Sequence, residues 1–249
     1  MEKIDTSNSE KHLLNSYFKL FEVGRVFSWI VGILLISEIF VFALFPSITD
    51  PKQLLIDFSK NWFIGLLRFD LLGVISYLLL IPITIGLYVA TKSVSKILAL
   101  LGLTLFLVGV AMFLSTNTGF SVLSLSKQFA NSVSDEERNT IIASCLSMII
   151  LFKVNAFMMS YIVVSGSWIL LSIAMHRCSL FSKFTSVSGI LAGSSGIFAE
   201  VLENSSDYLR WPAIVLYFLA IVFLIAWIHG IGVSFSRIYR PGSEMKSET

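Results

Sequence analysis

Five polar side chains lie within or beside stretches of sequence that are otherwise suited to lipid, and these residues could carry chemistry. Glu38 interrupts the apolar run ILLISEIFVFALF at 33–45. The other four stand near the starts of two later apolar stretches: Arg68, Asp70, Lys153 and Asn155. A charge at the centre of a bilayer costs about 2.5–3.5 kcal/mol, so such residues usually face the protein interior, pair with one another or become neutral.

We expect these five residues to lie near one membrane face. Glu38 lies seven residues, or about 10 Å along a helix, before Phe45 at the end of its apolar run. One hypothesis is an outward-facing polar pocket that binds the polar group of a ligand or relays a proton. The alternative is that Arg68 and Lys153 only extend to the lipid–water interface, while Glu38 is neutral and hydrogen-bonded to serines.

The composition is that of a membrane protein. Of 249 residues, 55% are hydrophobic and 14% are charged, and the mean hydropathy is +0.83. A soluble domain of this length carries more charge. The 18 basic and 16 acidic residues leave a net charge of +2, which supplies no strongly basic surface for nucleic acid. The expected partner is the lipid bilayer.

Six apolar stretches are long enough to cross the ~30 Å hydrocarbon core as helices of roughly 20 residues. Helices are expected because backbone polar groups in lipid must be satisfied within their own segment, and the alternating pattern of a β-barrel is missing. The predicted fold is an all-α polytopic membrane helix bundle. Its six spans are predicted at 26–45, 70–90, 97–114, 156–175, 184–201 and 211–233.

The distribution of lysine and arginine predicts the side on which each loop lies. Eleven basic residues fall in the N-terminal tail, the 91–96 loop, the 176–183 loop and the C-terminal tail, against seven in the longer loops of the other side. Because basic loops stay in the cytoplasm, we expect a multi-pass protein of the cell membrane with both termini cytoplasmic. The tails are predicted at 1–25 and 234–249, on either side of a membrane domain at 26–233.

The first apolar stretch is longer than the core of a signal peptide, so we expect it to remain as an anchor.

An outer amphipathic helical cap is predicted between the third and fourth spans. The segment SDEERNTIIASCLSMIILFKV begins with Ser134 as a helix N-cap and Glu137 three residues later, a capping-box pattern. Its apolar part is too short for an ordinary span, so we expect a helix at 135–153 that lies on, or dips into, the outer face. Upstream, apolar residues recur at helical spacing through 122–133 and predict an interfacial helix, with a short strand as the alternative.

Small residues indicate where helices approach one another, since close contact rather than hydrophobic exclusion drives helix association in lipid. The fifth predicted span carries Gly189 and Gly193 as a GxxxG pair, and the first carries Gly24, Ser28 and Gly32 at the same interval. We expect both to be inner packing faces. The functional alternatives are a dimer interface or close approach of the backbone to a ligand.

The sequence contains no HExxH, P-loop, GxSxG or cluster of histidines. No catalytic residue, metal ligand or cofactor is therefore predicted. The two cysteines, Cys145 and Cys178, are expected to be buried packing residues rather than a disulfide or a zinc pair.

The order of these features resembles a prokaryotic multi-span membrane family known only as domain of unknown function four-three-eight-six. The matching parts are LLRFDLLGVISYLLL, LYVATKSVSKILALL, FANSVSDEERNTIIA and HRCSLFSKFTSVSGILAG, and the resemblance covers about residues 20–230. The chain departs from the family pattern at Ser182, where a proline often precedes the basic residue. The resemblance implies a membrane helix bundle and supplies no catalytic residues.

Three functions are compatible with this sequence. The first is a non-enzymatic small-molecule binding, permease-like or sensing component with a small hydrophobic or amphipathic ligand. The second is a membrane enzyme acting on a lipid or isoprenoid, with Glu38 as acid and Arg68 as anion clamp. The third is a structural subunit that uses the glycine face of the fifth span to hold a membrane protein partner or a second copy of itself.

Overall fold

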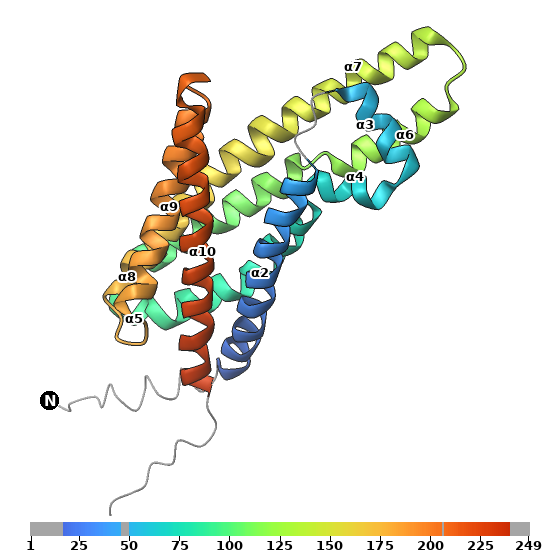
Figure 1. Ribbon diagram of the computed structural model, residues 1–249. Coiled ribbons are helices and arrows are strands. Elements are labelled where there is room, and N and C mark those ends of the chain that lie inside the picture. Colours follow the sequence, from blue (N-terminus) through green and yellow to red (C-terminus); the bar gives the residue numbers. More distant parts are fainter. Residues whose placement is uncertain (1–16, 46–49, 206, 240–249) are drawn as a thin grey trace, which may run out of the picture.

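The computed structural model describes residues 17–45, 50–205 and 207–239, and its elements are helices throughout this part of the chain, with no strand (Figure 1). The long helices are α2 Phe18–Leu44, α5 Leu71–Thr116, α8 Ser160–His176, α9 Lys183–Glu203 and α10 Arg210–Tyr239. The shorter elements are α3 Pro51–Lys60, α4 Trp62–Arg68, α6 Gly119–Asn131, α7 Asp135–Leu151, the π-helix η1 Phe152–Met159 and the 3-10 turn η2 Asp207–Leu209.

Within the described residues, five helical stretches are long and apolar enough to cross a membrane. This confirms an all-α chain with several helices of membrane-spanning length. Two of the five are much longer than one crossing needs, at 61 residues for 71–131 and 42 residues for 135–176. The predicted tails lie largely outside the described residues, at 1–16 and 240–249, and the first helix starts at Phe18 rather than at 26.

Helix α5 folds back on itself. Ser95 has non-helical backbone angles, φ −149° and ψ 67°. The rings of Tyr77 and Phe113, on either side of that break, lie 4.7 Å apart between centroids. The Asn117 side-chain amide donates to the Phe69 carbonyl at 3.2 Å, so the two ends also meet. The sequence predicted a six-residue loop at 91–96, and the structure replaces it with a break at one residue (Figure 1).

The long helices form a closed ring. Helix α2 packs against α5 and α10, α8 packs against α5 and α9, and α9 packs against α10. The ring encloses a core of large apolar side chains, among them Phe21, Ile83, Leu171, Trp227 and Phe235.

The small residues predicted to pack lie in different surroundings. A Cβ on Gly189 would collide with Ser172 and Trp227, and one on Gly193 would lie 2.5 Å from the Ser165 carbonyl oxygen. These two glycines therefore let α9 approach α8 and α10 closely.

The predicted packing face of α2, formed by Gly24, Ser28 and Gly32, contacts a neighbouring helix only in part. A Cβ on Gly24 would lie 2.8 Å from the Phe235 ring, and the buried Ser28 hydroxyl donates to the Gly24 carbonyl at 2.7 Å. A Cβ on Gly32 would meet nothing within 4 Å, because successive residues at a four-residue interval drift around the helix away from a straight partner.

A second apolar cluster joins α3, α4, α6 and α7. Its buried members are Leu54, Leu55, Phe58, Leu66, Phe69, Val122, Ile141, Cys145 and Ile149. Segment 119–131 is the predicted helix and not the alternative strand. Ser134 is the N-cap of α7 and accepts from the Glu137 backbone N–H at 3.2 Å.

Two features of this second cluster differ from expectation. Helix α7 continues without a break through η1 into α8, so 135–153 is the first part of a longer rod rather than a separate helix. Helices α3 and α4 lie in a stretch that the sequence treated as a connection, and they supply four of the nine buried residues of the cluster. Asp50 and Asn61 cap their N-terminal backbone N–H groups.

Candidate functional site

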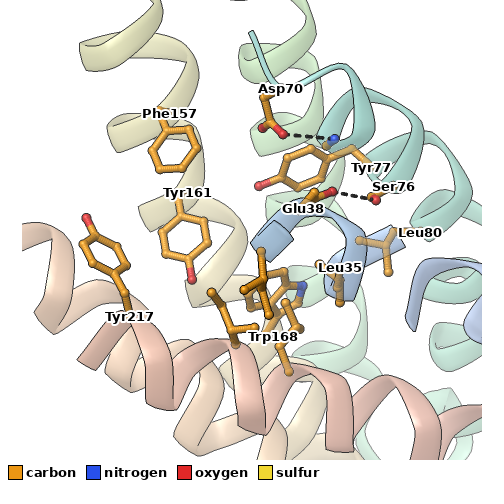
Figure 2. A pocket seen from close by; sticks show the side chains of 14 residues that line it. Leu35, Glu38, Asp70, Ser76, Tyr77, Leu80, Phe157, Tyr161, Trp168 and Tyr217 are labelled. Atoms are coloured by element: carbon orange, nitrogen blue, oxygen red, sulfur yellow. Dashed lines mark hydrogen bonds between the residues drawn. The ribbon is translucent and has the colours of Figure 1, made fainter. Parts of the chain in front are cut away.

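A cavity of about 280 Å³ lies inside the ring, between α2, α5, α8 and α10. Its polar and aromatic lining consists of Glu38, Asp70, Ser76, Tyr77, Phe157, Tyr161, Trp168 and Tyr217. Its remaining lining residues are Leu35, Ile39, Gly73, Leu80, Ile221 and Leu224. In the view of Figure 2 the two carboxyl groups lie on one side of the space, and Tyr161 and Tyr217 lie across from them.

Glu38 enters the cavity from α2, where it is half-buried. The Ser76 hydroxyl of α5 donates to Glu38 Oε1 at 3.1 Å, so the acid is bonded to a serine across two helices (Figure 2). A hydrogen bond from a serine to Glu38 was part of the alternative to the polar-pocket hypothesis. The bond from Ser76 uses one of the two carboxyl oxygens of Glu38.

Asp70 enters the cavity from the junction of α4 and α5. It is the one described non-glycine residue with a positive φ, at 58°, and it is the N-cap of α5. Its carboxyl accepts from the Gly73 backbone N–H at 3.0 Å, and a Cβ at Gly73 would collide with that carboxyl. Asp70 is 6% exposed.

The other three predicted pocket residues do not line the cavity. Arg68 pairs with Asp57 of α3, with 2.8 Å between Nη1 and Oδ2. Lys153 is exposed and Asn155 is half-buried in η1.

The structure thus brings together two of the five residues, Glu38 and Asp70. Arg68 is engaged elsewhere because the turn at Asn61 folds α3 back against α4, which puts an acid within reach of the guanidinium.

Three tyrosines of the lining were not singled out from the sequence. Tyr77, Tyr161 and Tyr217 come from α5, α8 and α10. The Tyr161 ring meets the Trp168 ring edge to face, with 6.0 Å between centroids and an interplanar angle of 89°. A signal was available, since each tyrosine puts a hydroxyl in the middle of an apolar stretch, where it needs a partner or a cavity.

Glu200 of α9 is a further buried acid, and it was not among the residues predicted from the sequence. It is 2% exposed. Its carboxyl lies near the Tyr217 hydroxyl, and its Oε1 has no hydrogen-bond partner among the described residues. Through Tyr217 it contacts the wall of the cavity. Its position within the predicted 184–201 span was the same kind of signal that Glu38 gave.

The arrangement can hold a small molecule by apolar contact and orient it by a few polar groups. Two carboxyl groups face the space, and the lining described by the structure contains no lysine, arginine or histidine. The indole N–H of Trp168, a residue only 2% exposed, is buried and has no hydrogen-bond partner among the residues that the structure describes.

Comparison with protein-family models, with curated proteins and with solved structures found no match for this chain.

Proposed function

We propose that this chain is a multi-pass protein of the cell membrane that binds a small amphipathic molecule in the cavity between α2, α5, α8 and α10, as a permease-like or sensing component. The observation that carries the proposal is the cavity itself. Apolar walls with a few converging polar groups are typical of small-molecule sites, whose volumes start at about 300 Å³. A volume of about 280 Å³ matches a compact ligand.

The proposal includes six crossings with cytoplasmic termini. The fold-back of α5 at Ser95 supports two crossings by this one helix, since each arm is long enough to span about 30 Å. The basic residues Lys92 and Lys96 beside the break favour the cytoplasm for that end. The cluster of α3, α4, α6 and α7 then lies at the outer face as the cap.

The rod from α7 to α8 supports the same placement. At 1.5 Å per residue, its 42 residues extend about 63 Å, twice the thickness of the hydrocarbon core. The α8 end lies in the membrane ring and the α7 end extends into the cap. The cavity is lined by the outer part of α2 and the starts of α5, α8 and α10, so it lies below the cap.

The enzyme alternative depended on Arg68 as an anion clamp. The pairing of Arg68 with Asp57 removes the observation that favoured it. The structural-subunit alternative depended on the glycine face of α9, which is occupied by α8 and α10 of the same chain.

The test is to fill the cavity with a larger side chain and to determine whether the purified protein still retains a bound small molecule. Ile221→Trp places an indole in the cavity, while Val222→Trp places one on the adjacent exposed surface of α10 as a matched control. We expect native mass spectrometry after gentle extraction to find a small molecule retained by the wild type and by Val222→Trp, and lost from Ile221→Trp. Retention of the same phospholipids by all three proteins would contradict the proposal, and a co-purifying protein without a small molecule would favour the structural subunit.

A further inference from the structure

We propose that the molecule bound in this cavity is an amphipathic organic cation, whose positive group lies at Glu38 and Asp70 and whose apolar part lies against Tyr161 and Trp168. This inference rests on the proposed function, because it names the chemical class of the ligand of that same cavity.

The first argument is the charge balance of the lining. Glu38 and Asp70 reach the same space from different elements, and the described lining residues include no basic side chain. The nearest candidate in sequence, Arg68, is bound to Asp57. A buried carboxylate without a counter-charge is unfavourable, so each of these acids must be neutralised by a proton or by something that enters the cavity. A cationic ligand satisfies this requirement.

The second argument is the geometry of the aromatic residues. The Tyr161 and Trp168 rings stand perpendicular at 89°, so they present two walls that meet at a corner. Aromatic faces attract ammonium groups through the ring quadrupole, and cages of such rings recognise quaternary ammonium ligands. Figure 2 shows Tyr77 beside the two acids, so a group at the carboxyls also contacts an aromatic ring.

The third argument comes from the unpartnered indole. Trp168 is buried, and its N–H has no acceptor in the part of the chain that the structure describes. A buried donor without a partner costs free energy that a bound acceptor recovers. A ligand with an oxygen acceptor beside its apolar part would take up this bond.

An inorganic cation fits the cavity less well. Hard cations need several oxygen ligands, about six to eight for calcium. The walls here are mostly apolar and supply two carboxyl groups and a few hydroxyls. An organic cation uses both the acids and the apolar walls.

Three probes that share a phenoxyethyl group separate charge from apolar contact. The cation and the neutral probe have the same shape, and the anion ends in a smaller, planar carboxylate. The cation is choline phenyl ether, the neutral isostere is 3,3-dimethylbutyl phenyl ether, and the anion is 3-phenoxypropionate. All three carry the same phenoxy oxygen as an acceptor. Binding to the purified full-length protein is measured by calorimetry in neutral maltoside micelles, with empty micelles as the blank. We expect the cation to bind at least about tenfold more tightly than the neutral isostere, and the anion not to bind.

The matched variants are Glu38→Gln and Asp70→Asn. The control is Glu22→Gln, because Glu22 lies on α2 like Glu38. Each of the first two keeps a side-chain oxygen that can accept the bond from Ser76 or Gly73, and asparagine tolerates the left-handed conformation at position 70. We expect each to weaken cation binding at least about tenfold and to leave the neutral isostere unchanged. Glu22 is outside the lining, so Glu22→Gln should bind like the wild type.

The outcomes distinguish the inference from the function on which it rests. If no probe binds and native mass spectrometry finds no small molecule that Ile221→Trp loses, the proposed function is wrong. If such a molecule is found but the cation does not bind, the cavity is a binding site and the cation inference fails. If the cation and the neutral isostere bind equally and neither acid variant changes this, the cavity is a binding site but the cation inference fails. Competition by added phosphatidylcholine would identify the cation as a lipid headgroup, and lack of competition would identify it as a free molecule; both support the inference.

Discussion

At the scale of a single residue, Asp70 lies where the chain passes from one apolar cluster to the other. It follows α4, whose Leu66 lies in the second apolar cluster, and it begins α5, which belongs to the ring. Its positive φ turns the chain between them, and its carboxyl caps α5 while facing the cavity. A residue held in this sparsely populated conformation beside a cavity is typical of functional sites.

The two carboxyl groups of the lining predict a pH dependence of cation binding. A cation prefers the ionised form of Glu38 and Asp70. Affinity for the cation should therefore rise with pH as these carboxyls lose their protons, by up to about tenfold per unit for each released proton. The titratable groups facing Asp70 are Glu38 of α2, Tyr77 of α5, Tyr161 of α8 and Tyr217 of α10. Tyrosines ordinarily titrate near 10, outside the range tested.

Calorimetry with choline phenyl ether from pH 4.5 to pH 8 checks this prediction. The control is Asp70→Asn, whose residual binding should depend less on pH. Equal wild-type affinities at pH 5 and pH 8 would contradict the assignment of Asp70 to the cation site.

At the scale of the element, α9 shows how small residues position the cavity. Gly189 and Gly193 let this helix approach α8 closely, and α8 carries Tyr161 and Trp168. On α2, by contrast, the Phe235 ring occupies the space beside Gly24, while a Cβ on Gly32 would point into open space. The same sequence pattern therefore has two different consequences, according to whether a partner helix lies over it.

This difference predicts opposite effects for two identical substitutions. Gly193→Ala puts a methyl group 2.5 Å from a backbone oxygen of Ser165, which cannot move aside as a flexible side chain could. We expect a loss of about 1–3 kcal/mol of stability, seen as a lower thermal-unfolding midpoint in detergent. Gly32→Ala should leave the midpoint unchanged or raise it, since alanine favours a helix interior over glycine by about 1 kcal/mol. Equal shifts in both variants would show that α9 does not pack as described.

At the scale of the whole molecule, two clusters share one continuous rod. The core inside the ring and the second apolar cluster are separate, and the rod of α7, η1 and α8 contributes to both. The cavity lies in the ring near this junction, where Asp70 and Phe157 line it.

The proposed topology predicts which exposed positions react with a membrane-impermeant maleimide in intact cells. Lys60→Cys and Lys127→Cys, in α3 and α6 of the cap, should be labelled from outside. Ser93→Cys, beside the break in α5, should be labelled only after permeabilisation. The native Cys145 and Cys178 are buried and free, and the unsubstituted protein measures their background. Labelling of all three positions from the same side would exclude two crossings by α5, and the reverse pattern would invert the molecule.

Much of the architecture could be predicted from the sequence because it depends on local properties. The length and hydropathy of a stretch decide whether it forms a long apolar helix, and the predicted spans fall largely within the five long apolar stretches of the described residues. The count of six crossings stays a prediction. A helix N-cap also depends on local sequence, and Ser134 is the N-cap of α7 as expected. Glu38 and Asp70 could be singled out because an acid in or beside an apolar run is costly wherever the helix lies.

Only the tertiary structure decided which of these residues meet. Glu38, Asp70, Tyr161 and Tyr217 come from four elements, and their convergence depends on the rotation of each helix within the ring. Arg68 is removed from the cavity by Asp57, eleven residues earlier, because α3 folds back. Hydropathy along the chain records how apolar a segment is and carries no information about which side of it faces a neighbour. That direction is set by contacts between residues far apart in sequence.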